Sequence, residues 1–164
     1  MNYPLLKNQL PESIKKVWKK TSVLTFLLLV IVGIAIAGIF TYFDALSRTW
    51  QLVLGVYFTV SILIFITTFL LITYRYTYFR YEITGKEVIF QKGFIFRSIT
   101  YVPFSRIQHI ETEQGPLLRK EQLMELIIHT AATNHHIAGL SIEEAQTIRD
   151  KVMVKVEEIS DDGY

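Results

Sequence analysis

The chain has 164 residues, of which 51% are hydrophobic and 20% are charged, with a formal net charge of +2. This length is typical of one domain with an appendage, and the absence of cysteine excludes a disulfide framework and thiol chemistry. Almost all of the charge lies in the first 20 and the last 90 residues. A long, nearly uncharged segment therefore separates two charged ends.

Residues 1–20 contain five lysines and one glutamate, a net charge of +4. Pro4 and Pro11 favour an irregular conformation, and Glu12–Lys20 could form a short helix at a membrane surface. We interpret residues 1–20 as a basic cytoplasmic tail.

Two apolar runs follow, residues 21–43 and 49–74, and neither contains a charged residue. A hydrocarbon core about 30 Å thick requires roughly 20 apolar residues of helix, so each run can cross a bilayer. A soluble chain of this length has too little other structure to bury two helices that are apolar on every face. A cleaved signal peptide is the alternative for the first run, because Ala35-Ile36-Ala37 resembles a cleavage site. The run continues past this site and a second span follows, so we predict a transmembrane hairpin over residues 21–74.

Basic residues predict the orientation of this hairpin in the cell membrane. Five lysines precede the first run, and Arg75 and Arg80 follow the second, whereas only Arg48 lies between the runs. By the positive-inside rule both termini are cytoplasmic and Asp44–Thr49 is a short external turn. Each run also has two small residues four positions apart, which could let the helices pack closely: Gly33 and Ala37, then Gly55 and Thr59.

After residue 74 the pattern changes to that of β-strands. Phe79, Tyr81 and Ile83 alternate with Arg80 and Glu82, as in a half-buried strand over residues 75–83. Further runs rich in β-branched and aromatic residues predict five more strands, at residues 87–92, 94–102, 106–112 and 124–131 and in a short stretch ending near Leu140. Between the fourth and fifth of the six strands, Gly115-Pro116 is predicted to be a loop.

The pattern then changes to that of a helix. Ser141 and Glu144 have the spacing of a capping box. Apolar residues recur every three or four positions, at Ile142, Ala145, Ile148, Val152, Val156 and Ile159. We predict a small α+β domain over residues 75–159, in which this helix covers antiparallel sheets, and a tail at residues 160–164.

Two stretches of this domain, RYEITGKEVIFQKGFIFRSITYVPFSRIQHIETEQGPLLRK and IAGLSIEEAQTIRDKV, resemble the bacterial pleckstrin-homology-like domain, a domain of unknown function. The similarity rests on an ordered set of landmarks: Tyr81, Thr84, Gly93, Pro103, Ile107, Gln108, Gln114, Gly115, Arg119, Gly139 and Ala145. With the two preceding spans, the layout resembles the short YdbS-like membrane proteins of Bacillus and its relatives. One departure is Glu121-Gln122, where the family usually has an aromatic residue and a glycine.

The resemblance implies a pleckstrin-like barrel, in which two roughly orthogonal antiparallel sheets are closed at one end by the helix. It implies no catalytic activity, so neither an enzyme nor a cofactor is expected. YdbS-like proteins resemble components that accompany a larger membrane protein carrying several copies of the domain, and a heteromeric membrane complex is therefore expected. A role in cell-envelope protection is a further hypothesis that the residues do not test.

The ionisable residues form no recognisable catalytic or metal-binding motif. His129, His135 and His136 could surround one hairpin, but a metal site needs a third or fourth ligand at a defined spacing, and exposed turn histidines are the simpler interpretation. Glu111 and Glu113 could be paired acids, although an acidic surface is the simpler interpretation. We predict no catalytic, cofactor-binding or metal-binding residues and no small-molecule substrate.

Two classes of function remain. In the first, the domain is a scaffold that binds protein, with Tyr76 and Tyr78 as the candidate interface because they alternate away from the apolar face of the first strand. Simple anchoring at the headgroup level is the alternative interpretation of these tyrosines.

In the second class, the domain binds an anionic lipid headgroup through basic residues: Lys19, Lys20, Arg75, Lys86, Lys92 and Arg97. Residues 74–164 have 11 basic and 13 acidic side chains, a net charge of −2. This balance argues against a headgroup-binding site and against nucleic acid as a partner. We therefore favour the scaffold.

Overall fold

The computed structural model describes residues 4–43, 47–93 and 95–161, without the side chains of residues 159–161. The chain forms two compact units. One unit is Trp18–Ile72, and the other combines the N-terminal residues up to Val17 with all residues from Thr73 onward. We call the second unit the domain.

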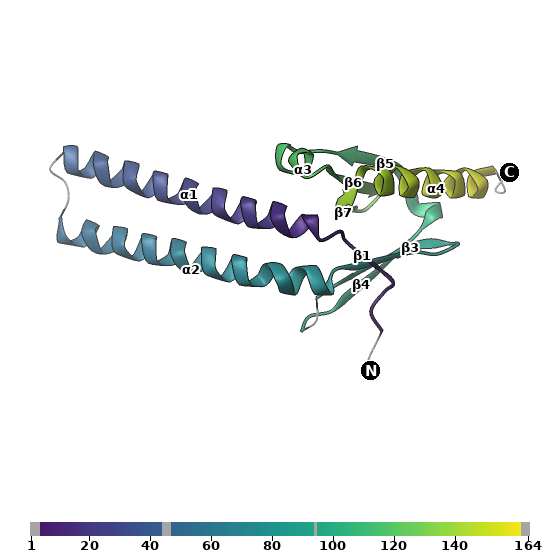
Figure 1. The fold of residues 1–164 in the computed structure, drawn as a ribbon, viewed down its shortest axis with the longest axis horizontal. Helices are drawn as coiled ribbons and strands as arrows, with labels where there is room; N and C mark the ends of the chain where they lie inside the picture. The colour runs from purple at the N-terminus through teal and green to yellow at the C-terminus, as the bar shows by residue number, and fades with distance from the viewer. Residues whose placement is uncertain (1–3, 44–46, 94, 162–164) are drawn as a thin grey trace. The chain divides into compact units, whose positions relative to one another are not determined.

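The Trp18–Ile72 unit is a pair of antiparallel helices that lie side by side (Figure 1). Helix α1 spans Ser13–Tyr42 and helix α2 spans Arg48–Tyr78, and both are long and apolar enough to cross a membrane. Only 6% and 11% of their most apolar windows are buried. The core helices of a soluble protein would be mostly buried, so this exposure favours two membrane spans. Of the predicted external turn, residues 44–46 lie outside the described part of the chain.

One of the two small-residue faces predicted for the hairpin packs against the other helix. A side chain at Gly33 would lie 2.7 Å from the ring of Tyr57 and 2.8 Å from that of Phe58, whereas Gly55 has open space around it. The Tyr57 hydroxyl also donates a 2.8 Å hydrogen bond to the carbonyl oxygen of Leu29. The hairpin therefore packs an aromatic pair of α2 against a glycine of α1.

The domain contains two antiparallel sheets and a helix that packs on the second of them (Figure 1). The first sheet has the order β1-β2-β3-β4, formed by Asn8–Gln9, Arg80–Ile83, Glu87–Lys92 and Ser98–Pro103. The second has the order β5-β6-β7, formed by Ile107–Glu113, Leu123–Thr130 and Asn134–Ser141. A 3-10 turn, η1 (Phe104–Arg106), connects the sheets. Two sheets and a C-terminal helix confirm the predicted α+β pleckstrin-like class, although the sheets do not close into a continuous barrel.

Helix α4 (Ile142–Asp161) begins where predicted, and the middle of its predicted apolar face is buried. The Ser141 hydroxyl accepts a bond of 3.1 Å from the Glu144 amide, and the Glu144 carboxylate accepts one of 3.1 Å from the Ser141 amide. This reciprocal pair is a capping box. Ala145, Ile148 and Val152 are buried on the side of the helix that faces the sheets.

The end of α2 differs from the prediction. The strand expected from residue 75 begins only at Arg80, because α2 continues through Tyr78 and the Phe79 amide still donates to the Arg75 carbonyl oxygen at 3.0 Å. The helix brings the rings of Tyr74 and Tyr78 together at 4.9 Å between centroids, as expected for residues four apart on a helix. Aromatic residues suit both conformations, so the local pattern did not locate this boundary.

Two other predicted segments also differ from the structure. The third predicted strand begins at Ser98 in β4, and its expected first residue, Phe94, lies outside the described residues. The expected loop after Gly115 contains a short helix, α3 (Pro116–Lys120), which begins with proline, a residue well suited to the first helical position. Gln122 adopts a left-handed conformation with φ of 54°, so the turn keeps the geometry for which the family's glycine is suited.

The N-terminal segment is part of the domain, which corrects its interpretation as a tail. Asn8 and Gln9 form β1 and pair with Tyr81 and Arg80 of β2. The Leu6 amide donates a 3.0 Å hydrogen bond to the Oε1 atom of Gln91, a fully buried side chain. Three apolar side chains of this segment are buried: Leu10, Ile14 and Val17. Residues 13–17 are also the first residues of α1, so no separate interfacial helix is present.

Candidate interaction surfaces

The basic residues suggested for lipid binding do not form one site. Lys86 lies before β3 and Lys92 is its last residue, and a strand of this length extends about 20 Å. Arg97 immediately precedes β4, and therefore lies at the same end of the hairpin as Lys92. A headgroup-binding pocket needs converging cations, and these three residues are divided between opposite ends of the β3–β4 pair.

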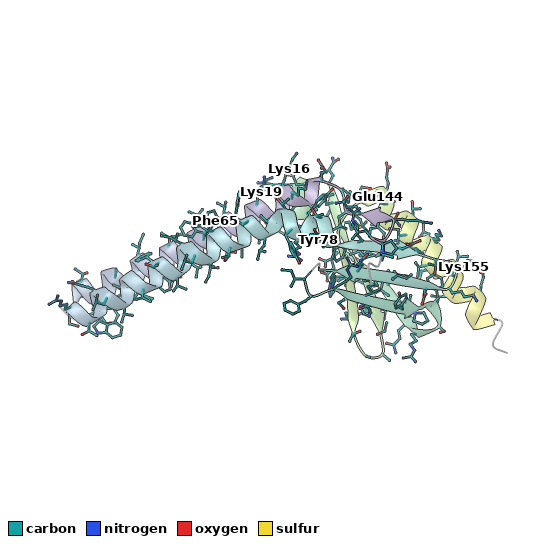
Figure 2. The ribbon with its side chains drawn as sticks, turned by 90° about the horizontal axis from the view of Figure 1, so that it is seen from below. Lys16, Lys19, Phe65, Tyr78, Glu144 and Lys155 are labelled. Atoms are coloured by element: carbon teal, nitrogen blue, oxygen red, sulfur yellow. The ribbon has the colours of Figure 1, made fainter. Side chains whose placement is uncertain are left out.

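The other basic candidates lie on the long helices. Lys19 and Lys20 are exposed on α1, and the Lys19 ammonium lies 5.8 Å from the centre of the Phe69 ring. Figure 2 shows Lys19 on the helical pair, with Phe65 farther along it. Arg75 is exposed on the last turns of α2. Positions near the ends of apolar helices are typical of basic residues that reach the headgroups.

The two candidate tyrosines are not a pair of exposed strand residues. Tyr76 is buried within the domain, where its ring lies 4.0 Å from the Lys15 ammonium and its carbonyl oxygen accepts a 3.3 Å hydrogen bond from the Gln9 side chain. Tyr78, labelled in Figure 2, is half-buried. Their helical conformation places them on different sides of α2. The candidate interface required both tyrosines to be exposed, and Tyr76 is not.

The histidines interact with neighbouring side chains on the second sheet. The rings of His109 and His129 stack with their centroids 4.1 Å apart, and His129 Nε2 lies 3.2 Å from a carboxylate oxygen of Glu111. His136 Nδ1 lies 2.9 Å from a carboxylate oxygen of Glu125. Within the described residues, no group of three or more acidic or histidine side chains could hold a metal ion.

A groove lies beside the turn η1, between the end of β4 and the start of β5. It has a volume of about 490 Å³ and extends along the end of β4, the turn η1, the start of β5 and the β6–β7 turn. Its lining combines an aromatic ring, a cation and small polar groups: Tyr101, Pro103, Arg106, Gln108, Thr133 and His135. Tyr101 is 56% exposed, and tyrosine and arginine are among the residues enriched at the energetic centres of protein interfaces.

His135 lies at the wall of this groove. Its ring stacks on the buried ring of Phe90 at 5.3 Å between centroids, and its Nε2 atom lies 3.0 Å from the Thr133 hydroxyl. Burial lowers the pKa of His135 below its usual 6.5, with smaller contributions from the charges of Lys92 and His136. The imidazole is therefore neutral at pH 7 and offers the groove a polar surface without a charge.

The groove adjoins the open edges of both sheets. Among the described strands, β4 pairs only with β3 and β5 only with β6. An edge strand presents unpaired amide and carbonyl groups that can pair with a further strand. Pro103 at the end of β4 and the register shift between Ile107 and His109 limit how far such pairing could extend. The sequence did not predict this groove. Its only local signal was an aromatic residue, Tyr101, at an outward-facing position of a strand.

The chain matches known proteins over nearly its whole length. The family model described as the bacterial PH domain matches residues 13–155. The UPF0699 transmembrane protein YdbS of Bacillus subtilis (strain 168) is 34% identical over 160 residues, which cover 95% of this chain and 96% of that protein. No solved structure matches significantly. These findings confirm the predicted resemblance, and with the two apolar helices they support a membrane protein with two spans. The chain belongs to the bacterial PH domain family.

Proposed function

We propose that this protein is a non-catalytic membrane component whose domain acts as a cytoplasmic assembly module. The observation that supports this proposal is the groove beside the open edges of β4 and β5, with exposed Tyr101 and Arg106 at its wall. Peptide segments commonly bind such edges by adding a strand, while side-chain pockets provide specificity. The partner that fits this proposal is a membrane protein carrying related domains, in a complex that could serve cell-envelope protection.

Charge supports a protein partner over a headgroup. The residues from 74 onward have a net charge of −2, and the basic candidates Lys86, just before β3, and Lys92, its last residue, are separated by the length of the strand. The five lysines before the first span support the proposed cytoplasmic position of both termini. A negatively charged domain on that side would be repelled weakly by an anionic leaflet, whereas an interface built on Tyr101 would be insensitive to this repulsion.

Co-purification from the native membrane in mild detergent tests the proposal. Tyr101→Ser and Arg106→Ser should each weaken partner recovery at least fivefold, since truncating a central interface residue usually costs about 1 kcal/mol or more. Recovery with the unaltered chain should persist at high salt, because a closely packed interface is screened little. Gln146→Ala, on the exposed face of α4, is the matched control and should retain the partner.

The lipid alternative predicts a different result. Replacing Lys86, Lys92 and Arg97 by glutamine would then reduce binding of the full chain to anionic lipids in a salt-dependent way, and Tyr101→Ser would have no effect. Unchanged partner recovery with both Tyr101→Ser and Arg106→Ser would contradict the assembly proposal.

A further inference from the structure

The turn between β3 and β4 exposes two large apolar side chains. Ile95 is 77% exposed and Phe96 is 91% exposed, the largest fraction among the exposed large apolar residues that the structure describes. Adjacent apolar side chains in this position are costly in water, and contiguous exposed apolar surface commonly marks contact with a protein or a membrane. The turn is therefore a candidate contact surface.

The backbone of this turn is tightly constrained. Gly93 has φ of +75°, and a Cβ atom there would lie 2.2 Å from the carbonyl oxygen of Phe96. Only glycine permits so close an approach. The two apolar side chains therefore lie next to a close backbone approach that depends on Gly93.

The last turns of α2 place this turn beside the membrane boundary. The Ile95 amide donates a 3.2 Å hydrogen bond to the hydroxyl of Tyr74. Tyr74 ends the uncharged run 49–74 and is followed directly by Arg75. Tyrosine at such a position marks the level where hydrocarbon meets the headgroups. A backbone amide bonded to this hydroxyl lies at nearly the same depth.

Basic residues flank the apolar pair. Lys92 and Arg97 lie on either side of it in sequence, and the Lys92 ammonium is 5.6 Å from the centre of the Phe79 ring. Apolar side chains with flanking lysine or arginine are typical of segments that lie in the interfacial layer, because the cations meet anionic headgroups while the apolar groups enter the acyl boundary.

We propose that the β3–β4 turn is a membrane anchor, with Ile95 and Phe96 inserted into the interfacial layer of the bilayer that α2 crosses. The Ile95 amide is bonded to Tyr74, the residue that ends the second apolar run, and this favours lipid over a second protein as the covering partner. The domain then contacts the membrane at a point distinct from the groove, and the groove is left open to a partner.

Site-directed labelling of the full chain in lipid vesicles tests this anchor directly. The chain has no cysteine, so Phe96→Cys and Ile95→Cys each accept a single fluorophore. The vesicles consist of phosphatidylcholine and phosphatidylglycerol, with a small fraction of lipid that carries a quenching nitroxide near the headgroup. The matched control is Val154→Cys on α4, which is 52% exposed.

We expect the nitroxide lipid to quench the labels at residues 95 and 96 at least threefold more strongly than the label at residue 154. Quenching at both positions no stronger than at residue 154 would overturn the proposal. Protection of both labels from a water-soluble quencher without quenching by the lipid would also overturn it, because that result identifies a protein contact. The measurement does not involve the groove, so its outcome is separate from that of the partner recovery assay.

Discussion

At the scale of single residues, Gly139 links two parts of the domain that are far apart in the chain. It lies in β7 with φ of +89°, and a Cβ atom there would be 2.5 Å from the Cδ1 atom of Ile14. Ile14 belongs to the N-terminal segment and is almost completely buried. The absent side chain of Gly139 therefore makes room for the segment that sequence reasoning treated as a tail.

Gly139→Ala should destabilise the full chain by roughly 2 to 4 kcal/mol, combining the cost of a left-handed alanine with that of overpacking. Thermal unfolding of the purified protein in detergent measures this loss. Gly85→Ala is the matched control, because a Cβ atom at Gly85 meets no other atom within 4 Å. Equal unfolding temperatures for the two variants would show that Ile14 does not pack on Gly139.

His135 should make the domain sensitive to mild acid. Since burial lowers its pKa in the folded state below 6.5, the unfolded state binds the proton more readily, and this contribution to stability is lost as the pH falls below 6.5. The difference in unfolding temperature between the wild type and His135→Gln should therefore shrink between pH 7.5 and pH 5.5. The other three histidines are common to both proteins and largely cancel. A difference that does not change with pH would contradict the assignment.

Burial also favours the neutral form of Tyr81. Burial, followed by the negative charge of Glu144, raises the pKa of the Tyr81 hydroxyl to about 12. The phenol is therefore neutral throughout the physiological range. Tyr81 pairs with both Asn8 and Phe90, so this neutral buried ring lies where the N-terminal strand joins the sheet.

At the scale of elements, the domain is completed by parts of three helices. The first residues of α1 and the last residues of α2 belong to the domain, and α4 covers the second sheet and the turn η1 through one apolar face. A fragment that begins at residue 75 would lack β1 and the buried side chains of Leu10 and Ile14. Stability experiments on this domain therefore require the full chain.

Ile148→Ala should destabilise the domain by about 2 to 5 kcal/mol, the usual cost of truncating a buried isoleucine. Ile148→Asp should have a larger effect, because it would bury an unpaired charge. Gln146→Ala, two residues away and on the exposed face of α4, should leave the unfolding temperature unchanged. Chemical or thermal unfolding in detergent measures each variant, and an unaltered transition for Ile148→Asp would mean that α4 is not docked.

At the scale of the whole molecule, two apolar helices and a charged domain define a membrane protein with two spans. The helices require a bilayer because their apolar surfaces are exposed along most of their length. Five lysines precede the first span and Arg75 and Arg80 follow the second, whereas only Arg48 lies between the spans. This distribution of basic residues leads to the proposed orientation.

Reporter fusions test that orientation. A phosphatase that is active only outside the cytoplasm should be inactive when fused after Tyr164 and active when inserted at Ser47, because both termini are proposed to be cytoplasmic. A fluorescent protein that folds only in the cytoplasm should give the reverse pattern. Phosphatase activity at the C-terminus would rule out the orientation with both ends inside.

The sequence alone determined the features that depend on neighbouring residues. The two spans require only a count of consecutive apolar residues, the Glu87–Lys92 strand appeared with its observed bounds, and the capping box at Ser141 depends on residues three apart. Each is a local property, so it survives in the tertiary structure without help from distant contacts.

Only the tertiary structure decided the features that depend on distant contacts. The pairing of Asn8 with Tyr81 joins residues far apart in the chain, and no local pattern in a short polar stretch predicts it. The length of α2 past Tyr74 was ambiguous because aromatic residues suit both helix and strand. The groove at Tyr101 and the hydrogen bond from Ile95 to Tyr74 arise where separate elements meet. Their positions follow from packing, which a residue pattern along one strand or helix does not specify.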